Sequence, residues 1–136
     1  MSSYPIAKIE GIGPTYAEKL KTVGISNTKK YLERAKDAAG RKALEEETEI
    51  DHKRILKWAN MSDLMRIKGV GEEYSELLEA AGVDTVKELR NRNAANLTKA
   101  MKEANDEKKL VRQVPALSNV EKWVAQAKEL PPMMTY

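Results

Sequence analysis

The stretch Ile9-Glu10-Gly11-Ile12-Gly13 recurs 58 positions later as Ile67-Lys68-Gly69-Val70-Gly71. The two stretches continue to match in register on both sides, in the pairs Ile6 and Leu64, Lys8 and Arg66, Tyr16 and Tyr74, Leu20 and Leu78, and Gly24 and Gly82. Self-similarity at a fixed offset indicates one structural unit used twice. The sequence therefore predicts a single domain over residues 1–136, built from repeats at about 3–60 and 61–130. Residues 131–136 have no counterpart, and we expect them to fray.

The repeat drifts in spacing toward the end of each copy. Lys42-Ala43-Leu44 resembles Lys99-Ala100-Met101 at an offset of 57, and Trp58 resembles Trp123 at an offset of 65. The second copy therefore holds about eight extra residues, which we place near 105–115. Each Trp lies beside apolar residues at helical spacing. Core packing is therefore favoured over a platform on which nucleic-acid bases stack.

The pattern of apolar residues predicts helices almost throughout, with no sustained alternation that would indicate strands. Pro14 suits the first position of a helix, and Gly24 and Gly82 suit helix C-termini. Polar residues that suit helix N-termini are Asp51, Ser26, Asp84 and Ser118, the last in a capping-box pattern with Glu121. We expect an all-α fold of about ten short helices.

Composition excludes several classes of protein. The chain of 136 residues has no Cys and one His, so disulfides, thiolate zinc sites, a Cys nucleophile and multi-histidine metal sites are excluded. No apolar run approaches the roughly 20 residues that span a bilayer, and no signal peptide is evident. We expect a cytoplasmic protein with no membrane contact.

Charge is abundant but unevenly placed. Charged residues make up 33% of the chain, yet the net charge is +3. Residues 1–30 contain five Lys/Arg and two Asp/Glu, a balance of +3, whereas residues 62–90 contain four and seven, a balance of −3. Residues 91–136 contain eight and five, a balance of +3. A strongly basic nucleic-acid binder is excluded, but a local basic site is not.

The repeated apolar-x-Gly-apolar-Gly core, followed by a small residue at Ala17 or Ser75, resembles the helix-hairpin-helix motif. Glycines accept positive φ in the sharp turn between two helices, and the apolar residue between them can fill the space there. The resemblance implies a compact fold of two duplicated units, in the class of SAM-like and helix-hairpin-helix-like domains.

The turn also presents a possible anion site. Amides at the start of the helix that follows the second glycine lack acceptors, and the helix dipole favours negative charge there. In helix-hairpin-helix proteins this site typically holds a DNA backbone phosphate without reading sequence. For the first hairpin the candidate residues are Lys8, Gly11, Ile12, Gly13, Thr15 and Lys19. For the second, which we expect to bind less well, they are Arg66, Lys68, Gly69, Val70 and Gly71.

The two hairpins differ in charge. The first is followed by Pro14, Thr15 and Lys19, whereas the second is followed by Glu72 and Glu73, with Glu76 and Glu79 farther along. Carboxylates in a first helical turn complement the dipole and repel a phosphate. We therefore expect the first hairpin to bind phosphate and the second to be structural or to face a protein.

Over nearly its full length the chain resembles an uncharacterised bacterial family with tandem helix-hairpin-helix units. Residues 67–74 and 81–86 carry most of that resemblance, with 110–115 and 123–128 adding to it. The resemblance implies a helical fold and no established activity.

No nucleophile–base pair, phosphate loop or metal constellation is evident in the sequence. We therefore expect a non-enzyme with no catalytic residue, no cofactor, no metal and no small-molecule substrate. The favoured hypothesis is weak, sequence-independent DNA backbone binding through the first hairpin. The alternative is a protein-interaction module whose hairpins are structural and contact no nucleic acid.

Overall fold

The computed structural model describes residues 3–136, and these form helices connected by short turns. In chain order the helices are the 3₁₀ helix η1 (Ile6–Lys8), α1 (Pro14–Thr22), α2 (Thr28–Ala35), α3 (Ala38–Thr48), α4 (His52–Leu64), α5 (Glu72–Ala80), α6 (Val86–Leu89), α7 (Ala94–Lys108) and α8 (Leu117–Glu129). Over residues 3–136 the strand-like pairing consists of one isolated bridge between Pro5 and Asn27. The all-α prediction is confirmed, with slightly fewer helices than expected.

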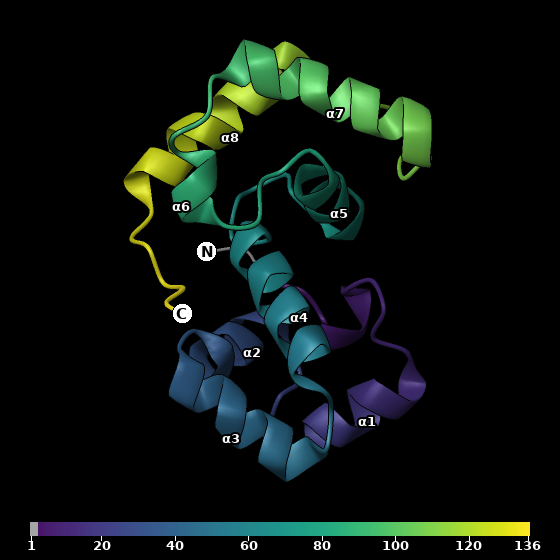
Figure 1. The fold of residues 1–136 in the computed structure, drawn as a ribbon, viewed down its shortest axis with the longest axis vertical. Coiled ribbons are helices and arrows are strands. Elements are labelled where there is room, and N and C mark those ends of the chain that lie inside the picture. The colour runs from purple at the N-terminus through teal and green to yellow at the C-terminus, as the bar shows by residue number, and fades with distance from the viewer. Residues whose placement is uncertain (1–2) are drawn as a thin grey trace.

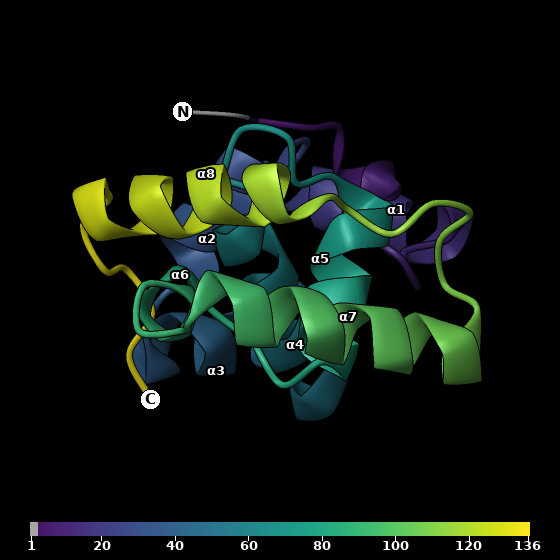
Figure 2. The same cartoon turned by 90° about the horizontal axis from the view of Figure 1, so that it is seen from above.

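Helix α4 connects the two parts of the domain. In Figure 1 it runs through the middle of the molecule, with α1–α3 around its N-terminal half and α5–α8 beyond its C-terminal end. Figure 2 shows α7 and α8 alongside each other, with α5 against them. Two buried apolar clusters follow this division, and they meet at the end of α4, where Met65 belongs to the first cluster and Leu64 to the second. The chain folds as one compact domain.

Helices α1 and α5 end in the same way. Gly24 and Gly82 have φ angles of +84° and +96°, which a residue with a Cβ rarely adopts. The amides of Ile25 and Val83 donate to the carbonyls of Leu20 and Leu78 at 2.9 and 2.8 Å. This is the glycine-terminated C-cap that the sequence predicts at both positions.

Three predicted helix starts need correction, whereas Asp51 caps α4 as expected. The N-cap of α2 is Asn27 instead of Ser26, and the N-cap of α6 is Thr85 instead of Asp84. Both side chains accept an amide hydrogen bond three residues on, so the helices begin one residue later than predicted. The capping box at Ser118 is wrong, because α8 already begins at Leu117, after Ala116.

The prediction that residues 131–136 fray is also wrong. Met134 is buried in the first apolar cluster. The amide of Thr135 donates to the Lys36 carbonyl at 2.8 Å, and the Thr135 carbonyl accepts from Arg41 at 2.7 Å. The Tyr136 hydroxyl bonds to Asn60 at 2.9 Å. A buried side chain and paired backbone groups hold this segment against the first half of the chain.

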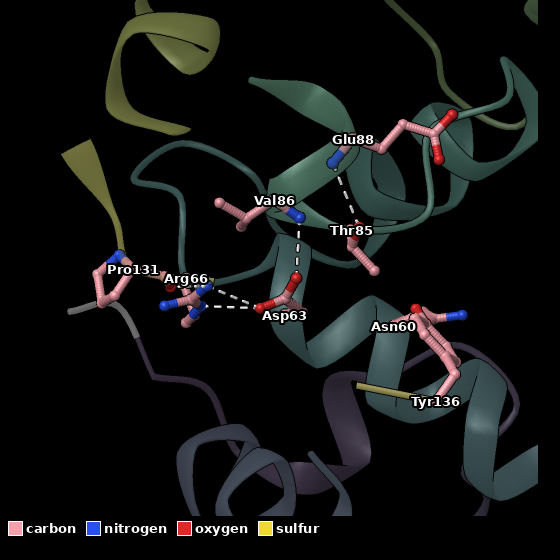
Figure 3. A network of polar contacts seen from close by, with 8 residues as sticks. All are labelled: Asn60, Asp63, Arg66, Thr85, Val86, Glu88, Pro131 and Tyr136. Carbon is pink, nitrogen blue, oxygen red and sulfur yellow. Dashed lines mark hydrogen bonds and ion pairs between the residues drawn. The ribbon is translucent and has the colours of Figure 1, made fainter. Parts of the chain in front are cut away.

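A buried ion pair lies where α4 ends and the second half begins (Figure 3). Arg66 donates to Asp63 from Nη2 at 2.8 Å and from Nε at 3.0 Å, and it also donates to the Pro131 carbonyl at 3.0 Å. The second carboxylate oxygen of Asp63 accepts from the Val86 amide at 2.8 Å. Burial raises the pKa of Asp63, while the Val86 amide and Arg66 act to lower it. Asp63 thus connects α4, the α6 N-terminus and, through Arg66, the C-terminal segment.

Candidate nucleic-acid interface

The first glycine turn connects η1 to α1. Gly11 has a φ of +93°, and the Ile12 amide donates to the Ile9 carbonyl at 3.1 Å. Ile12 is buried, whereas Gly11 and Gly13 are exposed. Gly13 is the N-cap of α1, and a Cβ built on it would meet nothing within 4 Å. The apolar residue therefore fills the space under the turn, and the glycine backbone faces solvent, as predicted.

The second glycine turn repeats this geometry between α4 and α5. Gly69 has a φ of +96°, the Val70 amide donates to the Ile67 carbonyl at 3.1 Å, and Val70 is buried. Gly71 is the N-cap of α5 in an extended conformation, as Gly13 is for α1. The match at an offset of 58 in sequence is therefore also a match in backbone conformation.

A Trp lies beneath each turn. A Cβ added at Gly11 would lie 3.4 Å from Nε1 of Trp58, and a Cβ added at Gly69 would lie 3.1 Å from Nε1 of Trp123. Tyr16 packs edge-on against Trp58, with ring centroids 5.2 Å apart, and Tyr74 packs against Trp123 at 5.3 Å. Both indoles are buried, as expected for core residues.

The helices that follow the two turns differ in charge at their starts. Neither α1 nor α5 has a side chain that caps its first amides. The first turn of α1 holds no acidic residue, and Thr15 is exposed there. The first turn of α5 holds Glu72 and Glu73. An anion at α1 would meet free amides and the positive end of the dipole.

The structure corrects the placement of two predicted phosphate ligands. Arg66 is buried and paired with Asp63, so its guanidinium cannot serve the second hairpin. Lys8 is exposed, and it lines a hollow with Gly69, Gly71 and Tyr4, although we assigned it to the first hairpin alone. Lys8, three residues before Gly11, therefore lies next to the second glycine turn. Lys19 is half-buried and lies with Lys21 in the last turn of α1.

A family model described as a domain of unknown function, DUF4332, matches residues 10–130. The chain belongs to the DUF4332 family. No solved structure matches it. Within residues 3–136 of this DUF4332 protein, no group of three or more acidic or His side chains could hold a metal ion. No helix in the same range has the length and apolar character needed to cross a membrane.

Two of the glutamates on α5 of this DUF4332 chain, Glu76 and Glu79, lie on the side that faces the first half. Burial raises the pKa of Glu76, and the carboxylate of Glu10 raises it further, while Lys57 on α4 lowers it. Burial also raises the pKa of Glu79, again with Lys57 lowering it. Glu76 and Glu79 therefore both lie close to Lys57 on α4. Of the four glutamates expected to repel a phosphate, Glu72 and Glu73 are the ones at the α5 N-terminus.

Sequence reasoning missed Arg54 as a basic residue near the first hairpin. Its guanidinium carbon lies 5.5 Å from the centroid of the Tyr16 ring, at the third residue of α1. It also pairs with Asp51, and both side chains are exposed. The sequence signal that could have identified Arg54 is its position one helical turn before Trp58. Because Trp58 lies beneath Gly11, a residue on that side of α4 is near the glycine turn.

Proposed function

We propose that this DUF4332 protein is a non-catalytic, cytoplasmic helix-hairpin-helix module that binds a DNA backbone weakly and without sequence preference through its first hairpin. One observation carries the proposal: the exposed, uncapped α1 N-terminus behind Gly13, with no acidic residue in its first turn. The first-hairpin set comprises Gly11, Ile12, Gly13, Thr15 and Lys19, with Arg54 beside Tyr16. Phosphate contacts of this kind position a protein on DNA and carry no base information.

The position of Lys8 at the second glycine turn supports a contact that extends beyond one phosphate. Lys8 reaches the hollow at Gly71, and Lys68 is exposed at the same turn. Glu72 and Glu73 at the start of α5 weaken the contact there. With few phosphates neutralised, we expect a dissociation constant of roughly 10⁻⁴–10⁻⁶ M near physiological salt.

The alternative, a protein-interaction module, has less support. Within residues 3–136 the exposed large apolar side chains are Leu117 and Tyr136, on α8 and in the C-terminal segment. Protein-docking surfaces commonly gather such side chains into a patch. Two side chains on separate segments do not form one.

The test measures the anisotropy of a fluorescent duplex at about 50 mM salt, where phosphate contacts are strong. Gly13→Asp places a carboxylate at the anion site without loss of fold, because Asp is a good N-cap and the position is open. We expect about tenfold weaker binding, as for the loss of one charge-assisted hydrogen bond. Gly71→Asp is the matched control and has a smaller effect. Absence of wild-type binding at tens of micromolar protein, or a larger loss in Gly71→Asp, contradicts the proposal.

A further inference from the structure

We infer that the surface beneath residues 131–136 is a docking site for an extended peptide, and that its second occupant is the same segment of another copy of this chain. In the structure the chain's own segment lies on this surface, against the end of α2, α3 and α4. The inference concerns self-association, and it does not depend on DNA binding at α1.

The segment is held by its backbone and by one buried side chain. The Thr135 amide donates to the carbonyl of Lys36, the C-cap of α2, at 2.8 Å, and the Thr135 carbonyl accepts from Arg41 at 2.7 Å. Met134, next to it, is 7% exposed and lies in the first apolar cluster. Proteins that bind extended peptides use main-chain hydrogen bonds for affinity and side-chain pockets for specificity. A segment from another molecule would make the same contacts, because none of them involves α8.

Arg41 is the buried group that an occupant satisfies. Its side chain is 2% exposed, and within residues 3–136 no carboxylate forms an ion pair with it. Nη1 donates to the Ala35 carbonyl at 2.8 Å and Nη2 to Thr135, while Nε has no acceptor. The Tyr136 ring covers the guanidinium, 5.4 Å from its centroid. Departure of the segment removes the Thr135 acceptor and opens the site of Met134 to water, and entry of another segment reverses both losses.

The connection between α8 and the docking surface is short. Arg66 holds the Pro131 carbonyl at 3.0 Å in the second half, and Met134, three residues later, is buried in the first half. Pro131 and Pro132 are both exposed. Each proline ring fixes φ, and consecutive prolines favour an extended backbone. An extended connection suits a segment that reaches another molecule as well as one that covers its own.

A second copy is the occupant that these contacts favour, because residues 131–136 already fit the surface. Two copies that exchange the segment form a closed two-fold dimer, in which each surface holds the partner's segment. The chain's own segment competes with the exchange, since a short connection holds it at an effective concentration in roughly the millimolar range. We therefore expect a monomer in dilute solution and a dimer where the connection is too short to close.

The first experiment changes the connection in the full chain. Deletion of Pro132 and Met133 leaves one Cα–Cα step of about 3.8 Å between Pro131 and Met134, in place of three steps that span up to about 11 Å. The segment then cannot reach its own docking surface, and we expect a dimer in sedimentation velocity at about 100 µM. Insertion of Gly-Ser after Pro132 is the control and should leave a monomer. A folded deletion variant that stays monomeric overturns the inference.

The second experiment keeps the connection and also decides the matter if the deletion variant does not fold. Full-length Met134→Ala protein, whose own segment is held weakly, is titrated with a synthetic peptide of residues 130–136. The peptide should bind saturably at millimolar concentration and raise the melting temperature. A peptide with Ala in place of Met134 should bind about tenfold more weakly, because it lacks the buried side chain. Absence of saturable binding, or equal binding of the two peptides, overturns the inference.

Discussion

The indole nitrogen of Trp123 lies 3.1 Å from the place where a Cβ at Gly69 would stand. Trp58 and Gly11 are related in the same way at 3.4 Å. Gly11 and Gly69, the first glycine of each copy of the motif, therefore meet two requirements: a positive φ and room for a Trp from the last helix of the same half. This pairing links the start of each repeat to its end, across the intervening helices.

We expect Gly69→Ala to destabilise the fold by about 1–3 kcal/mol, because the side chain would be strained at a φ of +96° and pressed against Trp123. Gly13→Ala is the control, since Gly13 has a negative φ and open space around it. Urea unfolding of both variants measures the difference. Equal stability of the two would show that the Gly69 turn does not have this conformation.

The buried pair of Asp63 and Arg66 should be costly to break. We expect Asp63→Ala to cost about 3–5 kcal/mol, because it leaves the Arg66 guanidinium buried and the Val86 amide without its acceptor. Asp51→Asn disrupts the exposed pair with Arg54 and keeps a good N-cap, so a loss of about 0–1 kcal/mol is expected. Denaturant midpoints compare them. A loss of stability in Asp63→Ala as small as that in Asp51→Asn would indicate that the pair of Asp63 and Arg66 is exposed to solvent.

The carboxylate of Glu76 should make stability depend on pH. Because the folded protein holds the Glu76 proton more tightly than the unfolded chain, stability falls as pH rises from the ordinary value of 4.5 through the raised pKa. Glu76→Gln should therefore raise the melting temperature at neutral pH and have no such effect well below the ordinary Glu pKa. Glu73→Gln, which removes a favourable charge from the exposed first turn of α5, should lower it slightly. A Glu76→Gln variant that is less stable at neutral pH contradicts this assignment.

The repeated glycines made the fold predictable, because positive φ, a buried apolar plug and a small residue in the next helix are local requirements. The site was less predictable. Arg66 aligns with Lys8, but it also lies three residues after Asp63 at the end of α4, and the ion pair with Asp63 determines its role. Lys8 lies next to the second turn through tertiary packing that no local pattern records.

The C-terminal segment shows the same limit. Residues 131–136 have no repeat partner and no helical pattern, so sequence reasoning placed them in solvent. Met134 enters the first apolar cluster from the far end of the chain. We expect Met134→Ala to cost about 2–5 kcal/mol, as for other buried Met truncations. Met133→Ala, at a half-buried neighbour, should cost less. Thermal unfolding measures both, and an unchanged melting temperature in Met134→Ala would mean that the segment frays after all.

Substitution of Arg54 separates an effect on DNA binding most clearly from an effect on stability. Its guanidinium is exposed and lies over the Tyr16 ring, beside the α1 N-terminus where a phosphate would bind. Arg54→Gln should weaken duplex binding similarly for every sequence and reduce the slope of log K against log salt by about one phosphate contact. Arg34→Gln also removes an Arg from an ion pair, with Glu47 at 2.5 Å, but on α2. It should leave the slope unchanged. Equal slopes for Arg54→Gln and the wild-type protein would place the bound phosphate away from the first hairpin.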